Sequence, residues 1–236
     1  MSGPQCAHNP PTLDPASGAG HVQQIGGFNT YVTGDQDSKL AIIFLADAFG
    51  WEVPKLRKLA DKVAESGFLV VVPDFYYGDK FTLEKAGQGW VDTHPPDRGC
   101  DDARTIIAAL KSKGVSKIGA AGFCWGGMVA VRLAKYDCIE AAVVLHPGPI
   151  TVEEINEVKT PIAILGAEID HIGPPEMVKQ LEDVLSSKPE VDSFVKIFPG
   201  VGHGWTVRYN DDDEFEVKSA LESHSDMLNW LTKYVK

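Results

Sequence analysis

The sequence predicts an α/β fold with three layers, in which one mostly parallel sheet is covered by helices on both faces. Apolar runs of strand length recur along the chain, as in residues 39–47 and 160–170. Amphipathic segments of helix length separate these runs, and turn residues bound them. Because a strand that is covered on both faces is apolar throughout, this alternation is typical of a parallel sheet between two helical layers.

The length of 236 residues fits a single domain of this class. Residues 1–20 are rich in Pro, Gly and Ser, and we expect an extended arm there. Residues 21–236 then form the domain. This length leaves no room for a large inserted cap, so we expect the aromatic-rich loop 76–97 to be the lid of any pocket.

The expected elements follow in order along the chain. The expected strands are residues 28–34, 39–47, 68–74, 116–123, 139–148, 160–170 and 192–200. The expected helices are residues 51–67, 101–114, 125–136, 175–187 and 213–234. The acidic run 210–216 is interpreted as the start of the last helix, where carboxylates suit the positive end of the dipole.

Composition excludes several classes of partner. The formal net charge is −11 and the cations are scattered, so neither nucleic acid nor a membrane surface is expected to bind. No apolar run approaches the roughly 20 residues of a membrane helix, and the first residues lack the features of a secretion signal. We therefore expect a cytoplasmic protein, either a monomer or a homodimer.

The cysteines indicate neither a zinc site nor a disulfide framework, because Cys-x-x-Cys spacing is absent. Cys138 is expected in the core, and Cys6 and Cys100 are expected to be ordinary loop or helix-start residues. Cys124 differs from them, since it stands between a predicted strand and a predicted helix. Ligands and chemistry collect at the carboxyl ends of strands in such sheets, and the polar residues expected there are Asp47, Asp74, Cys124, His146, Asp170 and His203.

Glycines surround Cys124 in the stretch "GFCWGG", residues 122–127. A dinucleotide fingerprint would need glycine at the position of Cys124, where a pyrophosphate approaches the backbone, so we reject that interpretation. The pattern G-x-nucleophile-x-G fits better, because it forms the strained elbow that presents a nucleophile in α/β-hydrolases. A helix that begins at the thiol also favours the thiolate and offers free N–H groups.

A nucleophile of this kind needs a base and an acid that orients it, in the chain order nucleophile, acid, histidine. Asp170 ends one predicted strand, and His203 lies in the loop after the next. Taken alone, Asp170 could equally cap the following helix. The backbone N–H groups of Ala48 and Trp125 are the expected oxyanion donors. We expect His171 and His224 at the surface, and His146 is a candidate for the pocket lining.

The motifs together resemble the dienelactone hydrolase family, the cysteine-nucleophile branch of the α/β-hydrolases. The resemblance runs from about residue 20 to the carboxyl terminus and rests on "LADAFGW", "VVPDFYYGD", "GFCWGG", "GAEIDHIGPPE" and "GHGWTVR". The arm "CAHNPP" is similar to eukaryotic members, some of which carry glucanase-like names. The resemblance implies hydrolysis of small esters and lactones without a metal or organic cofactor, by Cys124, His203 and Asp170.

The chain departs from the bacterial members at one position. They typically carry a glutamate that contacts the cysteine, and Asp47, which is one methylene shorter, stands in its place. Arg208 resembles the arginine that grips a substrate carboxylate. Arg98 is interpreted as an exposed residue at a helix start. The pocket is expected to be shaped by aromatic side chains: Phe49, Trp51, Tyr76, Trp90, Trp125 and Trp205.

Two other functions stay open at this point. One is a ligand receptor or regulator on a hydrolase fold with little turnover, because fold does not fix function. The other is a glycan hydrolase, which normally requires two facing carboxyl groups. Asp47 and Asp170 are better explained as parts of a cysteine site, so glycan hydrolysis ranks below the receptor.

Overall fold

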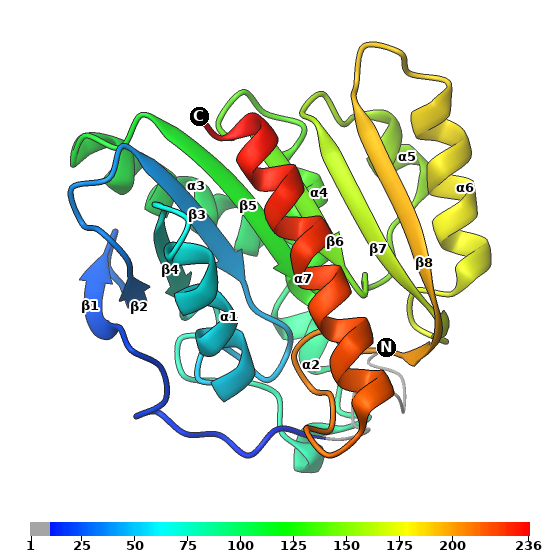
Figure 1. Ribbon diagram of the computed structural model, residues 1–236, viewed down its shortest axis with the longest axis horizontal. Helices are drawn as coiled ribbons and strands as arrows, with labels where there is room; N and C mark the ends of the chain where they lie inside the picture. The colour runs from blue at the N-terminus through cyan, green and yellow to red at the C-terminus, as the bar shows by residue number, and fades with distance from the viewer. Residues whose placement is uncertain (1–9) are drawn as a thin grey trace.

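An eight-stranded sheet in the order β1-β2-β4-β3-β5-β6-β7-β8 forms the centre of the molecule (Figure 1). The structure is a computed structural model that describes residues 10–236. The strands are His21–Ile25 (β1), Phe28–Thr33 (β2), Leu40–Leu45 (β3), Leu69–Pro73 (β4), Lys117–Phe123 (β5), Ala141–Leu145 (β6), Ile162–Ile169 (β7) and Ser193–Gly202 (β8).

Helices cover both faces of this sheet. They are Pro54–Ala64 (α1), Trp90–Thr93 (α2), Pro96–Ser112 (α3), Trp125–Leu133 (α4), Val152–Asn156 (α5), Pro175–Ser186 (α6) and Glu214–Tyr234 (α7). Figure 1 shows α1 and α7 in front of the sheet, with α3 and α4 behind it. The predicted three-layer α/β class is confirmed.

The strands of the sheet's centre are parallel and apolar. From β4 through β3, β5, β6 and β7 to β8, each strand runs parallel to the next strand in the sheet. Every residue of β6 is fully buried, as expected for a strand that is covered on both faces. The carboxyl ends of these strands therefore meet at one edge of the sheet.

An antiparallel hairpin extends the other side of the sheet: β2 matches the expected strand 28–34, whereas β1 lies outside the expected strands. β1 pairs with β2, which in turn pairs with β4. Gly26 and Gly27 form its two-residue turn, with φ of 60° and 90°. Positive φ at both positions suits the right-handed twist of a hairpin and favours glycine. The sequence of β1 alternates little in polarity, so periodicity alone did not predict this strand.

The expected helix boundaries agree with the structure in part. α7 begins after Asp213, whose Oδ1 accepts hydrogen bonds from the N–H groups of Phe215 at 2.9 Å and Glu216 at 3.1 Å. This confirms the interpretation of the acidic run. α3 begins at Pro96, earlier than expected, because proline is favoured in the first turn of a helix. The short helices α2 and α5 and the 3₁₀ turn Leu83–Lys85 were not predicted.

The described part of the arm, residues 10–20, is held against α1 by a buried arginine. The guanidinium of Arg57 donates to the carbonyl of Pro15 at 2.6 Å and lies 4.7 Å from the ring centroid of Tyr31. Asp61 of the same helix accepts from the N–H of Ala19 at 2.8 Å. Cys6 lies outside the described residues. Within residues 10–236, none of the helices has the length and apolar character needed to cross a bilayer.

Candidate active site

Cys124 lies in a strained turn between β5 and α4. Its backbone has φ 51° and ψ −109°, a region that costs a non-glycine residue about 1–3 kcal/mol. A Cβ atom on Gly126 would lie 1.9 Å from the carbonyl oxygen of Leu45, and one on Gly122 would lie 2.1 Å from that of Gly126. Only glycine fits at either position. This close approach is the physical reason for the G-x-Cys-x-G pattern.

Asp170 and His203 are in direct contact at the same edge of the sheet. Oδ2 of Asp170 lies 2.8 Å from Nδ1 of His203, and both side chains are fully buried. Oδ1 of Asp170 accepts from the N–H groups of Ile172 at 2.8 Å and Gly173 at 3.1 Å. Burial alone raises the pKa of Asp170, but the bonds from His203 and these N–H groups hold it below its usual value of 3.8. The acid is therefore ionised and fixed in direction.

The ring of His146 packs against the ring of His203. His146 is fully buried, its φ is 38°, and its ring meets the His203 ring edge to face at 5.1 Å. Its Nδ1 lies 3.0 Å from Oγ1 of Thr206, a buried residue that sequence reasoning missed. Burial, together with His203 and Arg208, lowers the pKa of His146 well below 6.5, so the ring is neutral at neutral pH.

His224 is buried, which corrects the expected surface position. Its Nε2 lies 2.7 Å from the carbonyl oxygen of Thr206, so α7 is joined to the loop that carries His203. No sequence signal distinguished this histidine, because its partner is a backbone carbonyl. Burial lowers the pKa of His224 to about 4.

The depressed pKa of His224 predicts a loss of stability in acid. An unfolded histidine titrates near 6.5, so between pH 6.5 and 4 the unfolded chain binds a proton that the folded chain does not. The free energy of unfolding should therefore fall as pH falls through this range, by about 2–3 kcal/mol at pH 4.5 from this group alone. Urea unfolding at pH 7 and 4.5 measures this. His224→Gln, whose amide can still donate to the Thr206 carbonyl, should lose less stability than the wild type between pH 7 and 4.5. An equal loss in both proteins would contradict the depressed pKa of His224.

Asp47 and Arg208 form a buried ion pair beside the cysteine turn. Nε of Arg208 lies 3.5 Å from Oδ2 of Asp47, and the two side chains are 3% and 2% exposed. Oδ1 of Asp47 accepts from the N–H of Phe49 at 3.0 Å, and the guanidinium lies 5.0 Å from the Phe49 ring. The shorter aspartate is thus held by an arginine, which places a buried cation at the site.

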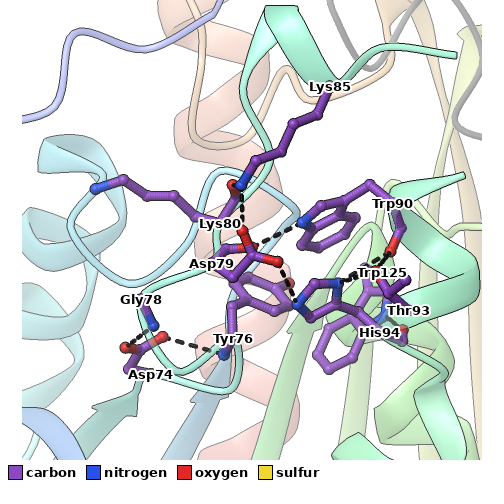
Figure 2. A network of polar contacts seen from close by, with 10 residues as sticks. All are labelled: Asp74, Tyr76, Gly78, Asp79, Lys80, Lys85, Trp90, Thr93, His94 and Trp125. Atoms are coloured by element: carbon purple, nitrogen blue, oxygen red, sulfur yellow. Dashed lines mark hydrogen bonds and ion pairs between the residues drawn. The ribbon is translucent and has the colours of Figure 1, made fainter. Parts of the chain in front are cut away.

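The predicted pocket aromatics fall into separate groups. Tyr76, Trp90 and His94 of loop 76–97 cluster with Trp125, the first residue of α4, as Figure 2 shows. Trp205 packs on the ring of His146 at 5.7 Å. The guanidinium of Arg57 lies 4.8 Å from the Trp51 ring, so Trp51 contacts the arginine that holds residues 10–20 against α1. Arg98 lies in the first turn of α3 with a side chain that is 58% exposed, as interpreted from the sequence.

Cys124 and the side chain of His203 are both buried. Cys124 is 5% exposed, and the side chain of His203 is fully buried. Loop 76–97 is tied to the cysteine turn, because Nε1 of Trp125 donates to the carbonyl of His94 at 2.7 Å. Among residues 10–236, no three His, Cys, Asp or Glu side chains are grouped as metal ligands.

The three described cysteines differ in predicted reactivity. Burial and Asp101 raise the pKa of Cys100 to about 11, and burial raises the pKa of Cys138. Cys124 begins α4, where the helix dipole favours a thiolate. With Cys6 replaced by serine, limited iodoacetamide at pH 7 should label Cys124 at least about tenfold faster than either other thiol. Peptide mapping measures the rates, and preferential labelling of Cys100 with activity intact would contradict the assignment.

Comparison with known proteins identifies the family of the chain. Residues 28–235 match the model of the dienelactone hydrolase family. A carboxymethylenebutenolidase homolog of Xenopus tropicalis is 33% identical over 228 residues, which cover 92% of this chain and 91% of that protein. An endo-1,3;1,4-beta-D-glucanase of Zea mays is 39% identical over 193 residues, or 79% of this chain, but the match spans only 63% of the maize protein.

Solved structures support the same fold. A putative dienelactone hydrolase of Klebsiella pneumoniae superposes with a TM-score of 0.74 at 20% identity, over 88% of this chain and 93% of that one. TT1662 of Thermus thermophilus superposes with a TM-score of 0.71 at 16% identity, over 90% and 97% of the two chains. The family match and the similarity over most of the chain agree with the resemblance seen in the sequence. The chain therefore belongs to the dienelactone hydrolase family, a family of hydrolases.

Proposed function

We propose that this hydrolase cleaves small esters or lactones through Cys124, His203 and Asp170. One observation carries the proposal: a strained cysteine begins a helix at the sheet edge where a buried aspartate holds a histidine. A nucleophile, a base and an orienting acid are the minimum set for acyl transfer through a covalent intermediate.

The reaction would proceed in two halves. His203 takes the proton of the Cys124 thiol, and the thiolate attacks the ester carbonyl carbon. The N–H groups of Ala48 and Trp125 stabilise the oxyanion that forms on the carbonyl oxygen. The C–O bond to the leaving group then breaks, and His203 returns the proton to the departing oxygen. Water, deprotonated by His203, attacks the thioester and releases the acid and the thiol.

Arg208 favours a substrate that carries a carboxylate. It is a buried cation paired with the carboxylate of Asp47. Anionic partners stabilise a buried cation, and a substrate carboxylate would be such a partner. The Xenopus relative is named a carboxymethylenebutenolidase homolog, and the carboxymethylene group in that name supports this choice.

Two alternatives receive less support. The maize relative is named as a beta-glucanase, but glycan hydrolysis normally uses two facing carboxyl groups. Here Asp47 contacts Arg208 and Asp170 contacts His203. A receptor with little turnover needs no nucleophile, so it leaves the strain at Cys124 unexplained.

Pre-steady-state kinetics with an aryl ester tests the proposal. Wild-type protein should release a burst of about one equivalent of phenol and form a thioester on Cys124, visible as a mass increase of the acyl group. Cys124→Ala should give no burst. A panel of lactones, with and without a carboxylate, then defines the substrate class. Binding of lactones without a burst would favour the receptor, and cleavage of a mixed-linkage β-glucan by Cys124→Ala would favour the glucanase.

A further inference from the structure

We propose that Tyr76 is a positioning residue of the oxyanion hole: its hydroxyl holds the Asp47–Ala48 peptide so that the Ala48 N–H faces the carbonyl oxygen of the substrate. The inference rests on the proposed function, because it assigns a role within the same acyl transfer. Tyr76 was expected only to line the pocket, and its contacts indicate a more specific role.

The backbone of Tyr76 is fixed by a turn just after β4. Oδ1 of Asp74 accepts from the N–H of Tyr76 at 3.0 Å, and Oδ2 accepts from the N–H of Gly78 at 2.8 Å. Figure 2 shows the Asp74 carboxylate between these two N–H groups. The Tyr76 side chain is 1% exposed. The side chain therefore starts from a rigid backbone and extends into the interior.

The hydroxyl of Tyr76 bonds the peptide that carries the proposed donor. It donates to the carbonyl oxygen of Asp47 at 2.9 Å and lies 3.2 Å from that of Ala46. The carbonyl of Asp47 and the N–H of Ala48 belong to one planar trans peptide, in which they point in opposite directions. Fixing the carbonyl thus fixes the direction of the N–H. A hydrogen bond to the carbonyl also polarises the peptide and strengthens its N–H as a donor.

Neighbouring contacts hold the rest of this loop in place. The N–H of Gly50 donates to the carbonyl of Asp47 at 2.9 Å, and the N–H of Phe81 donates to the carbonyl of Ala48 at 2.9 Å. Phe81 belongs to loop 76–97, so two residues of that loop, Tyr76 and Phe81, bond the segment that precedes α1. The loop therefore supports the peptide from its carbonyl side.

The ring of Tyr76 also contacts the segment that supplies the second donor. Its centroid lies 4.9 Å from the Trp125 ring and 4.8 Å from the Trp90 ring, with both pairs close to edge to face. Figure 2 shows these rings together with His94 in one cluster. Trp125 follows Cys124 directly, and its backbone N–H is the other proposed donor. One side chain thus fixes the spacing between the two oxyanion donors.

Tyr76→Phe tests the role, because it removes the hydroxyl and keeps the ring cluster. Loss of a whole oxyanion donor costs about 10²–10³ in kcat, and a misdirected donor should cost about 10- to 100-fold. We expect the burst rate with an aryl ester to fall by that factor with little change in KM. Alkylation of Cys124 by iodoacetamide should stay within about twofold, because displacement at a saturated carbon forms no oxyanion.

Tyr77→Phe is the matched control. Tyr77 is the next residue of the same loop, it is 55% exposed, and its hydroxyl donates to Asp102 at 2.8 Å. Loss of the Tyr77 hydroxyl should leave both the burst rate and the rate of Cys124 alkylation unchanged. An unchanged burst rate in Tyr76→Phe would overturn the role of Tyr76. A parallel fall of burst and alkylation would also overturn it, since Tyr76 would then support the cysteine turn as a whole. A wild-type protein that is alkylated but never acylated would instead overturn the proposed function, and this inference with it.

Discussion

Replacing His203 with alanine is expected to lower kcat for an aryl ester at pH 7 by about three orders of magnitude or more. In the proposed mechanism the thiolate is the nucleophile, and a free cysteine has a pKa near 8.5, so few thiols ionise at pH 7 without a base. In the same mechanism His203 protonates the leaving oxygen, which alanine cannot do. Stopped-flow measurement of the burst and steady-state kcat together separate the two roles.

The pH dependence of the variant distinguishes this explanation from general damage. Without a base, the rate should rise with pH as the thiol ionises by itself, and the neutral-pH plateau of the wild type should disappear. His224→Gln is the control, because His224 is also a buried histidine but bonds only the carbonyl of Thr206 among the contacts described for it. It should keep wild-type kcat at pH 7. If His203→Ala retains more than a tenth of wild-type kcat, His203 is not the base.

Much of this architecture could be predicted because it depends on local patterns. Strands such as β6 are apolar throughout, and that pattern is sufficient to identify a strand covered on both faces. The cysteine turn could be predicted because backbone atoms exclude any side chain at Gly122 and Gly126. Asp170 and His203 could be predicted because each follows a strand whose carboxyl end faces the same edge.

The remaining contacts could not be predicted, because they join residues distant in the chain through groups that leave no pattern. Arg208 contacts Asp47 across the site, and the sequence indicated only a substrate partner for that arginine. The bond from Tyr76 to the Asp47 carbonyl uses a backbone atom that every residue has. His224 likewise meets a backbone carbonyl, so the amphipathic pattern of α7 gave no reason to place it in the interior.

Replacing Asp170 with asparagine should lower kcat by about 10⁴-fold while leaving the shape of the site intact. Oδ1 of Asp170 accepts from two backbone N–H groups, those of Ile172 and Gly173, whereas the contact described for Oδ2 within residues 10–236 is with Nδ1 of His203. Asparagine has one oxygen and one NH₂ group. Turning the NH₂ toward the backbone would leave the buried N–H of Gly173 and the part-buried N–H of Ile172 without acceptors, at about 1–3 kcal/mol for a buried donor.

The asparagine oxygen should therefore face the backbone, and its NH₂ should donate to Nδ1 of His203. That bond forces the ring proton onto Nε2, so Nε2 cannot accept the proton of the thiol. Alkylation of Cys124 at pH 7 should then slow along with kcat, because both need the thiolate. Asp213→Asn is the control, since asparagine caps a helix as well as aspartate does, and it should change neither rate. A loss below tenfold in Asp170→Asn would mean that Asp170 serves the turn to Gly173 and does not orient the base.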